Sequence, residues 1–419
     1  MSAKNIFYAQ SGGVTSVINA TACGLIEAAR AEPNLFGKVL VGKNGIIGGL
    51  NEELIDTSLE SSQDIARLRY TPAGAFGSCR HKLPDPTKDI EPYKKLIEVF
   101  KAHDIGYFFY NGGGDSQDTT NKMAKVSKEL GYDLKCIGLP KTIDNDLPLT
   151  DTCPGFGSVA KYVAVSIREA GLDVLSMAKT STKVFVMEVM GRHTGWIAAA
   201  GGLAAEQKHQ APHIILFPEI PFEQNRFLAK VKEANDLYGH CAIIVSEGIK
   251  DVHGQLLQKS SVSDSFGHAQ LGGIGPLIAN LVTRELQLKN HWAVCDYLQR
   301  SARHIASKTD VEQAYEIGKQ AIAYAKQNKN HIMLSIKRIS ASPYEWTIEG
   351  VDLNDVANQE KFLPRNYITT DGFHITDQCR EYLSPLIQGE DYPTYKNGLP
   401  DYVELQNNLV AKKLKTIEA

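Results

Sequence analysis

The chain has 419 residues, enough for about two or three domains. Hydrophobic residues make up 43% of it and charged residues 22%, an ordinary globular composition that argues against a collagen, a coiled coil or a disordered chain. The net charge of -3 argues against an extended nucleic-acid-binding surface, but it is compatible with a local basic pocket for a small phosphorylated ligand.

The cysteines and the N-terminus predict a reduced, cytoplasmic protein that does not enter a membrane. The seven cysteines are Cys23, Cys79, Cys136, Cys153, Cys241, Cys295 and Cys379. No two of them form a C-x-x-C pair, so a zinc ribbon or a thioredoxin-like motif has no support. The N-terminal sequence MSAKNIFYAQ lacks the apolar core of a signal peptide. No stretch approaches the roughly 18 unbroken apolar residues of a membrane span.

Short apolar runs alternate with longer amphipathic segments along the chain. In chain order, strands are expected at 6–9, 39–41, 105–110, 136–139, 184–189, 213–217, 242–245 and 332–336. Helices are expected at 17–30, 96–102, 117–130, 194–205, 223–236, 271–288 and 311–327, with one more at the C-terminus. This rhythm predicts βαβ units around a buried parallel sheet.

Glycine-rich loops follow two of the expected strands. The first, Ser-Gly-Gly at 11–13, lies between a strand and a helix. The second has three glycines at 112–114, directly before Asp115 and Ser116. Glycines let a ligand approach the backbone, and a helix N-terminus offers N–H groups to an anion. The plainer alternatives are a tight turn at the first loop and a helix cap by Asp115 or Ser116 at the second.

Charged residues follow two further strands. Lys141, Asp144 and Asp146 lie close together after one strand, and Arg192 follows Gly191 at the end of another. A phosphoryl transfer needs such a set: a base for a hydroxyl proton, an acid that helps to hold Mg²⁺, and cations for phosphate oxygens. Ligands bind at the carboxyl edge of open α/β sheets, so we expect these segments to meet at one site.

In this order, the segments resemble those of the phosphofructokinase family over roughly residues 4–305. The matching segments are Ser11-Gly12-Gly13, Gly77-Ser78-Cys79-Arg80, Gly112 to Ser116, Pro140 to Asp146, Met190-Gly191-Arg192, Ser246-Glu247-Gly248 and Gly267-His268-Ala269-Gln270. The resemblance implies two Rossmann-like, three-layer α/β/α domains with mainly parallel sheets, and an active site in the cleft between them.

The resemblance also implies a division of labour between the domains. Residues 1–150, with a returning segment at roughly 255–300, would form the phosphoryl-donor domain. Residues 151–254, with part of 301–419, would form the sugar-phosphate domain. Lys183 stands where many relatives have an arginine that reaches a neighbouring subunit's sugar phosphate. We therefore expect a homodimer or homotetramer with an active site shared between subunits, and no nucleic-acid or membrane partner.

By this resemblance the reaction is phosphorylation of the C1 hydroxyl of fructose 6-phosphate to give fructose 1,6-bisphosphate, in glycolysis or gluconeogenesis. Asp144 would be the base, with Lys141 and Asp115 also catalytic. The sugar-phosphate site would comprise Thr142, Ile143, Asp144, Lys183, Met190, Gly191, Arg192, Glu247, Tyr297 and Arg300. The donor site would comprise Gly12, Gly13, Arg80 and Lys141.

The phosphoryl donor is expected to be pyrophosphate. ATP-using members of the family carry G-G-D-G-S and P-G-T-I-D-N-D, whereas pyrophosphate-using members carry G-G-D-D-S and P-K-T-I-D-N-D. This chain has Lys141 in the second motif, and Asp115 fills the position of the ATP-type glycine. A carboxylate there repels the α-phosphate of ATP and occupies its space, while pyrophosphate has no third phosphate.

Two departures from the family pattern concern the metal and the sugar phosphate. The family's metal-binding aspartate is Gly114 here, so Mg²⁺ is assigned to Asp115 and Asp146. Leu271 replaces the arginine of the ATP-type H-x-Q-R motif. Tyr297 and Arg300 resemble the Y-x-x-R substrate motif of pyrophosphate-type members, although such a pair is otherwise typical of a helix surface.

Three other readings stay open from the sequence. An ATP-dependent phosphofructokinase is disfavoured by Lys141 together with Asp115. A non-catalytic subunit that senses sugar phosphates is disfavoured by the presence of Asp144. A dinucleotide-dependent oxidoreductase would fit the α/β rhythm but lacks the glycine fingerprint with its downstream acid.

Overall fold

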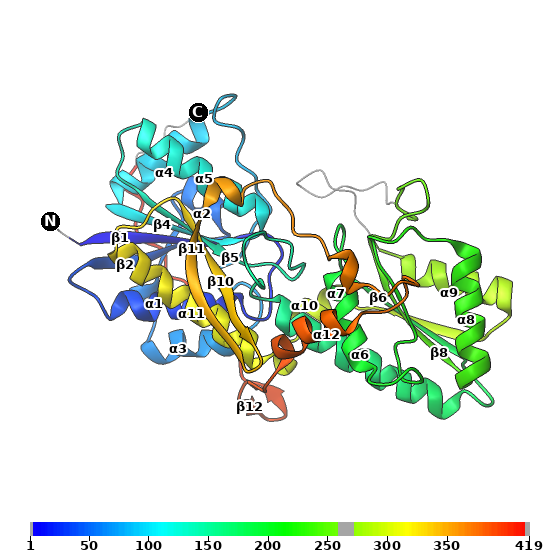
Figure 1. The fold of residues 1–419 in the computed structure, drawn as a ribbon. Coiled ribbons are helices and arrows are strands. Elements are labelled where there is room, and N and C mark those ends of the chain that lie inside the picture. Colours follow the sequence, from blue (N-terminus) through cyan, green and yellow to red (C-terminus); the bar gives the residue numbers. More distant parts are fainter. Residues whose placement is uncertain (1–2, 259–271, 415–419) are drawn as a thin grey trace.

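The computed structural model describes residues 3–258 and 272–414, so the Gly-His-Ala-Gln segment at 267–270 lies outside the described residues. Two units, each built around its own sheet, make up this part of the chain (Figure 1). Their arrangement confirms the expected α/β class with mainly parallel sheets.

The first unit contains a seven-stranded sheet with a parallel centre. In spatial order its strands are β11 (Tyr344–Asp352), β10 (Ile332–Ala341), β5 (Lys135–Pro140), β4 (Ile105–Gly112), β1 (Lys4–Gln10), β2 (Phe36–Gly42) and β3 (Leu54–Asp56). The outermost strands β11 and β3 run antiparallel to their neighbours. The parallel strands are nearly continuous apolar runs because both faces of the sheet are covered.

Helices cover both faces of this sheet. They are α1 (Ile18–Arg30), α2 (Ile46–Leu50), α3 (Ser62–Arg67), α4 (Glu91–Ala102), α5 (Gly114–Glu129) and α11 (Lys308–Lys326). Tyr8 packs in the core beneath α1 and α11, and its neighbour Phe7 packs in the core beneath α4 and α5. Successive strand residues point to opposite faces, so a continuous apolar strand supplies both cores.

Glycines allow α11 to pack closely on α1. A Cβ at Gly318 would lie 2.0 Å from the carbonyl oxygen of Thr21, and one at Gly24 would lie 2.1 Å from that of Tyr315. These contacts are with rigid helix backbone, so a larger residue at either position would push the two helices apart. The close approach fixes α11 in the first unit.

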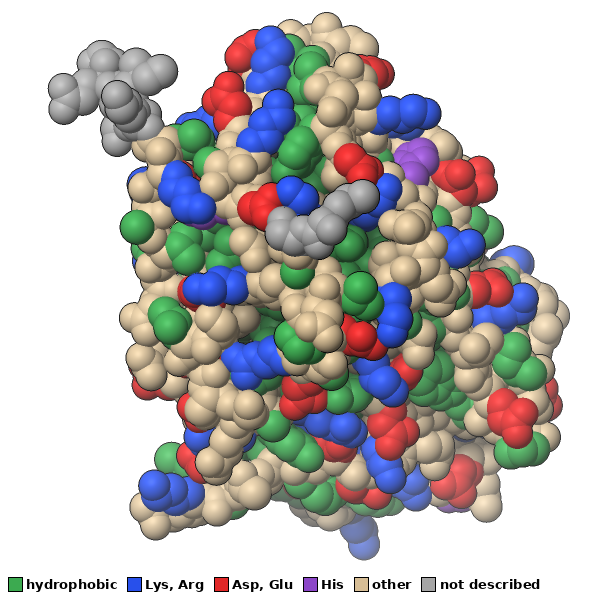
Figure 2. All heavy atoms as spheres, turned by 90° about the vertical axis from the view of Figure 1, so that its left-hand side faces the viewer, with side chains coloured by type: hydrophobic (Ala, Val, Ile, Leu, Met, Phe, Trp, Pro, Cys, Tyr) green, Lys and Arg blue, Asp and Glu red, His purple; other side chains and the backbone are tan. Residues whose placement is uncertain are grey.

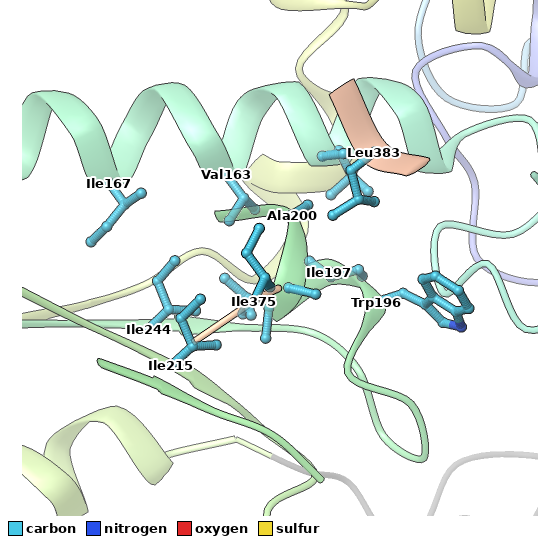
Figure 3. Packing of buried hydrophobic residues seen from close by; sticks show 14 of the residues in the cluster. Val163, Ile167, Trp196, Ile197, Ala200, Ile215, Ile244, Ile375 and Leu383 are labelled. Carbon is cyan, nitrogen blue, oxygen red and sulfur yellow. The ribbon is translucent and has the colours of Figure 1, made fainter. Parts of the chain in front are cut away.

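The second unit contains a four-stranded parallel sheet. In spatial order its strands are β7 (Ile214–Leu216), β8 (Cys241–Ser246), β6 (Val184–Val189) and β9 (Asn290–Val294). Its helices are α6 (Phe156–Met177), α7 (Trp196–Gly201), α8 (Gln224–Tyr238), α9 (Ile274–Leu286), α10 (Asp296–Ser301) and α12 (Asp377–Leu383). Figure 3 shows one of its cores, where Val163 and Ile167 of α6 face Ile215 and Ile244 of the sheet.

Short elements complete the described chain. The 3₁₀ helices are Thr57–Leu59, Leu68–Tyr70, Gly202–Ala204, Arg303–Ile305, Leu353–Asp355, Arg365–Tyr367 and Ser384–Ile387. A small hairpin is formed by β12 (Tyr395–Lys396) and β13 (Leu399–Pro400).

The chain passes between the units at places that differ from the sequence-based expectation. Strand β9, inside the expected returning segment 255–300, pairs with β6 in the second sheet. The return to the first sheet is made instead by α11, β10 and β11. Backbone hydrogen bonds between strands distant in sequence decide which sheet each strand joins, and the composition of the chain does not reveal these pairings. The assignment of donor and sugar roles to the units stays a prediction.

Most expected elements are present, although strands β3, β9 and β11 and helices α2, α3, α10 and α12 were not expected. The longest helix of the described chain, α6, was not expected. The expected C-terminal helix is absent from residues 401–414, which run irregularly along the edge of the first sheet. There the amide of Asp56 donates to the carbonyl of Asn408 at 2.9 Å, and that of Val410 to the carbonyl of Leu54 at 2.9 Å. Hydrogen bonds to the edge strand β3 thus satisfy backbone N–H and C=O groups that a helix would otherwise pair internally.

Two structural observations concern the cysteines and the apolar character of the helices. All seven cysteines are unpaired thiols. Across the two described ranges, no helix combines the length and the apolar character needed to traverse a bilayer.

A buried histidine makes the second unit sensitive to acid. His213 lies just before β7, 8% exposed, and its Nδ1 accepts a hydrogen bond from the Ala242 amide at 3.0 Å. Burial lowers the pKa of His213 to about 4, and His240, His374 and His209 lower it further, partly offset by a hydrogen bond to the His209 carbonyl. Protonation would place a hydrogen on Nδ1 against the Ala242 N–H, so the fold requires the neutral ring.

We therefore predict that the free energy of unfolding decreases as the pH falls. The pKa in the fold is depressed, so the stabilisation is complete above the unfolded value near 6.5 and is lost as the pH falls toward 4. Relative to His213→Asn, whose amide oxygen can still accept from Ala242, the wild type should lose about 2 kcal/mol between pH 7 and pH 5. Urea unfolding at both pH values measures this, and equal losses for the two proteins would contradict it.

Candidate active site

A cavity of ≈ 1000 Å³ lies where the carboxyl ends of strands from both sheets meet. From the first unit and the loop that leaves it come Gly12, Gly13, Arg80, Asp115, Lys141, Thr142, Ile143, Asp144 and Asp146. From the second unit come Glu188, Met190, Arg192, Thr194, Glu247, Asp296, Tyr297 and Arg300. The structure thus brings together in one cleft most of the residues that the sequence singled out, from segments nearly 300 positions apart.

Three cationic side chains converge on the β1–α1 turn. Buried Lys141 donates its Nζ to the carbonyl of Gly13 at 2.7 Å. A Cβ at Gly13 would lie 2.7 Å from Nη1 of Arg300 and 3.6 Å from Nη2 of Arg80. The missing side chain at Gly13 therefore makes room for two guanidinium groups beside a lysine. Arg300 comes from the second unit, so this cation cluster also joins the two sides of the cleft.

The cation cluster is electrostatically strained. Burial lowers the pKa of Lys141 to about 8, and the positive charges of Arg300 and Arg80 lower it further. Burial also lowers the pKa of Arg300. Like charges gathered in a cleft destabilise one another, and an anion placed among them would relieve that cost. The cluster is suited to an anionic ligand of high charge density, such as a phosphate.

Asp144 lies in the same cleft with two other carboxylates. Burial raises its pKa to about 7, with Asp146 and Glu247 raising it further and Lys141 opposing them. Its backbone is fixed on both sides: its amide donates to Oγ1 of Thr142 at 3.1 Å, and its carbonyl accepts from Oγ1 of Thr194 at 3.2 Å. A carboxylate that titrates near neutral pH on a fixed backbone is suited to exchange a proton.

The two predicted metal ligands differ in their surroundings. Oδ1 of Asp146 is buried and has no hydrogen-bond partner among the residues that the structure describes. Asp115 instead forms an ion pair with Nζ of Lys82 at 2.6 Å. The described ranges contain no group of three His, Cys, Asp or Glu side chains that could enclose a metal. Mg²⁺ is usually held by one or two carboxylates together with substrate phosphates, so Asp146 fits such a site.

The Met190–Gly191–Arg192 loop is tightly held against the end of β8. Oγ of Ser246 donates to the carbonyl of Gly191 at 2.6 Å, and the Gly191 amide donates to Oε1 of Glu247 at 3.3 Å. Gly191 has φ +135°, a conformation that favours glycine, and a Cβ at Gly248 would lie 2.1 Å from the carbonyl oxygen of Arg192. This packing fixes the loop that presents Arg192 and Met190 to the cavity.

Some predicted residues lie elsewhere. Lys183 does not line the cavity; it precedes β6, at the opposite end of that strand, and its Nζ donates to the carbonyl of Ala178. Gly191 does not line the cavity either. Tyr297 lines it while 62% exposed, and its ring lies 3.9 Å from the guanidinium of Arg300. The ring of Tyr297 thus packs on the guanidinium of Arg300, the arginine that reaches Gly13.

Sequence reasoning missed part of the cavity wall. Asn358, Gln359, Glu360 and Phe362 line it, although they lie more than 200 positions after Asp144. Lys82, the partner of Asp115, was also missed. The residues around 360 carry no glycine loop or charge motif that would single them out.

Comparison with known proteins agrees with the geometry. A family model described as Phosphofructokinase matches residues 5–325. A protein of Methylococcus capsulatus named pyrophosphate–fructose 6-phosphate 1-phosphotransferase is 58% identical over 99% of both chains. Crystal structures of pyrophosphate-dependent phosphofructokinases from Marinobacter aquaeolei and Nitrosospira multiformis superpose with TM-scores of 0.91 and 0.92. Their identities are 56% over 98% of both chains and 58% over 99% of both chains, respectively.

Proposed function

The chain belongs to the phosphofructokinase family, and we propose that it transfers a phosphoryl group from pyrophosphate to the C1 hydroxyl of fructose 6-phosphate. The products are fructose 1,6-bisphosphate and inorganic phosphate, and the chemistry can run in either direction. The observation that carries the proposal is the cluster of Lys141, Arg80 and Arg300 at Gly13, in the same cleft as Asp144. It provides an anion site beside a base.

On the donor side, the cation cluster binds pyrophosphate. Lys141 and the two arginines offer N–H groups around Gly13, where the missing side chain lets both guanidinium groups approach the turn. These fixed positive charges stabilise the charge that develops on the phosphoryl group and on the departing phosphate. They need little reorganisation, because Lys141 is already anchored on the Gly13 carbonyl.

On the acceptor side, Asp144 removes the proton of the C1 hydroxyl. The C1 oxygen forms its bond to phosphorus as the bridging P–O bond of pyrophosphate breaks. Inorganic phosphate leaves with that electron pair, and the proton passes to the Asp144 carboxylate. The sugar phosphate is held by Thr142, Ile143, Met190, Arg192 and Glu247, which line the same cavity.

Members of the family use a divalent metal, and we propose Mg²⁺ here, held by Asp146 with Asp115 nearby. The unpartnered buried Oδ1 of Asp146 supports this assignment. When bound, Mg²⁺ neutralises phosphate charge. Asp115 contributes through its ion pair with Lys82, which fixes the carboxylate at the start of α5.

Pyrophosphate is favoured over ATP by Asp115 and Lys141. Asp115 lines the cavity and is held by Lys82 at 2.6 Å, so its carboxylate stays fixed in the space that a third phosphate group would need. Lys141 supplies a positive charge at the position that is glycine in ATP-type members. A regulatory subunit would not need Asp144, and the β1–α1 turn has no dinucleotide fingerprint.

The purified protein assayed with each donor tests the function. We expect turnover of fructose 6-phosphate with Mg²⁺ and pyrophosphate, and a rate at least about 100-fold lower with ATP, which corresponds to about 3 kcal/mol of discrimination. Formation of fructose 1,6-bisphosphate gives the measurement. Robust activity with ATP and none with pyrophosphate would overturn the proposal.

A paired variant provides the control for the donor argument. Asp115→Gly combined with Lys141→Gly removes both residues of the pyrophosphate type and should weaken pyrophosphate use. Lys337→Met, in an exposed pair with Glu349 on β10 and β11, should leave it unchanged. Unaltered pyrophosphate kinetics in the double variant would show that these residues do not select the donor.

The role of Asp144 has its own test. Asp144→Asn keeps the size and the hydrogen-bonding backbone of the residue but removes the base. We expect kcat to fall by about 10²–10⁴-fold, while fructose 6-phosphate still binds, because general-base catalysis contributes about that factor. Steady-state kinetics and equilibrium binding of the sugar phosphate measure the two effects. A kcat equal to that of the wild type would remove Asp144 from the mechanism.

The protein is proposed to be an oligomer whose active site includes Lys183 of a second copy. The chain exposes large apolar side chains on neighbouring elements of the second unit: Leu172 of α6 (61%), Trp292 of β9 (50%) and Leu298 of α10 (65%). β9 is also an edge strand. Exposed apolar side chains at a sheet edge favour association with another chain.

Seven free thiols favour a cytoplasmic location.

Sedimentation analysis tests the oligomer. We expect a dimer or tetramer for the wild type, and a shift toward monomer with a parallel loss of activity for Trp292→Glu. Leu399→Glu, at an apolar and still more exposed position (71%) on the C-terminal hairpin, is the control and should not change the mass. A fully active wild-type monomer would contradict the shared site.

A further inference from the structure

A segment from the C-terminal part of the chain lies across the cleft. Residues 356–363, here called the crossing segment, lead from β11 of the first unit to the second unit. Nδ2 of Asn358 donates to Oδ1 of Asp118 at 3.1 Å in the first unit. Glu360 pairs with His193 at 2.9 Å, beside the Met190–Arg192 loop of the second unit. The crossing segment therefore contacts both walls of the active site, and it lies beyond the 5–325 range that the family model matches.

The polar groups of Lys361 all form hydrogen bonds with the loop that carries Asp144 and Asp146, with the chain that follows this loop, or with Trp196. Its amide donates to the carbonyl of Asp146 at 2.6 Å, and its carbonyl accepts from Nε1 of Trp196 at 3.0 Å. Its Nζ donates to three oxygens, at 3.2 Å to Oδ1 of Asn145, at 2.9 Å to the carbonyl of Thr150 and at 3.0 Å to that of Asp151. An ammonium has three N–H groups, so three acceptors satisfy it completely.

The acceptors belong to the residues that shape the loop. Asn145 lies between Asp144 and Asp146, with φ +54°, a left-handed conformation that asparagine tolerates. Its Oδ1 also accepts from the amide of Cys153 at 3.1 Å, and its Nδ2 donates to the hydroxyl of Tyr382 at 3.0 Å. Lys361 therefore ties the turn between the two acids to the chain some six positions later. The loop is closed from inside by one buried ammonium.

Loss of this ammonium would leave the Thr150 carbonyl without its donor in a region closed to water, and it would remove one of two donors from Oδ1 of Asn145 and from the Asp151 carbonyl. Burial lowers the pKa of Lys361, so the site tolerates a charge there only because the three acceptors compensate it. Trp196, whose ring lies 5.4 Å from Nζ, packs in the core of the second unit (Figure 3). Its ring also lies edge-on to that of Phe156 in the same core. Lys361 thus connects the loop to the packed core of the second unit through Trp196.

We propose that Lys361 is a positioning residue of the phosphotransferase reaction: it holds the Asp144–Asp146 turn in its productive geometry through Asn145 and the carbonyls of Thr150 and Asp151. It touches neither reacting group. A displacement of about 1 Å of a catalytic group lowers rates by about 100-fold, so the hold on this turn sets the turnover rate more than substrate affinity. The kinetic part of this inference rests on the proposed function.

The full-length variants Lys361→Met and Lys361→Arg test the inference. Methionine has a similar length but no N–H group, whereas arginine keeps the charge and the donors. We expect Lys361→Met to lower kcat about 10- to 100-fold with the KM for fructose 6-phosphate within about 3-fold, and Lys361→Arg to recover part of kcat. Hydrogen exchange of peptides that span residues 144–153 should quicken in Lys361→Met, most of all at the Cys153 amide.

The controls separate this inference from folding and from the proposed function. Lys337→Met, an exposed lysine on β10, should change neither kcat nor exchange in this loop. If Lys361→Met does not fold, Lys361→Gln replaces it, because glutamine keeps a shorter, uncharged donor. The inference is then supported when Lys361→Gln lowers kcat with KM unchanged, while Lys361→Arg keeps wild-type kcat and wild-type exchange at 144–153. Wild-type kcat in Lys361→Met, or in Lys361→Gln where the former fails to fold, overturns it. If the wild type shows no pyrophosphate activity, the proposed function fails, and unaltered exchange in the variants overturns the positioning role independently.

Discussion

Charges of both signs gathered in one cleft, several of them buried, set the conditions for the rest of this structure. Lys141, Arg80 and Arg300 meet at Gly13, while Asp144 and Asp146 share the same cavity. Each set is destabilised by its own like charges: the pKa of Lys141 is lowered and that of Asp144 is raised, in both cases by burial first. Buried charges of this kind are kept only where the scaffold holds them rigidly and where a ligand supplies the missing countercharge.

The scaffold meets this requirement at the ends of its strands. The turns after β1, β5 and β6 are fixed by contacts with backbone: Lys141 on the Gly13 carbonyl, Thr194 on the Asp144 carbonyl and Ser246 on the Gly191 carbonyl. Each contact joins two segments that carry site residues, so a shift of one loop is transmitted to another. The two sheets therefore act as one support for the chemistry, although each has its own cores.

Much of the fold and of the site could be predicted, for identifiable reasons. Buried parallel strands are continuous apolar runs, and the polar residues after them gather at one edge, so the loops that carry Asp144 and Arg192 were found from the sequence. The strand order could not be found in this way, because β9 (NHWAV) is short and mostly exposed, and its partner β6 lies about a hundred positions earlier. The helix α6 was missed, and Lys82 and Lys361 carry no motif that marks them.

The sequence by itself determined the chemical groups available to this protein, in the glycine turns and the Lys141–Asp146 segment. Local spacing suffices for these, since the charged groups lie within short loops after strands, whereas the choice of pyrophosphate over ATP was implied by the resemblance to the family's motifs. Only the tertiary structure decided that Arg300 reaches Gly13, that Asp115 is held by Lys82 and that Lys361 binds the loop that carries Asp144 and Asp146. Those contacts join residues from about 30 to nearly 300 positions apart, and they exist because strand pairing and core packing bring the segments together.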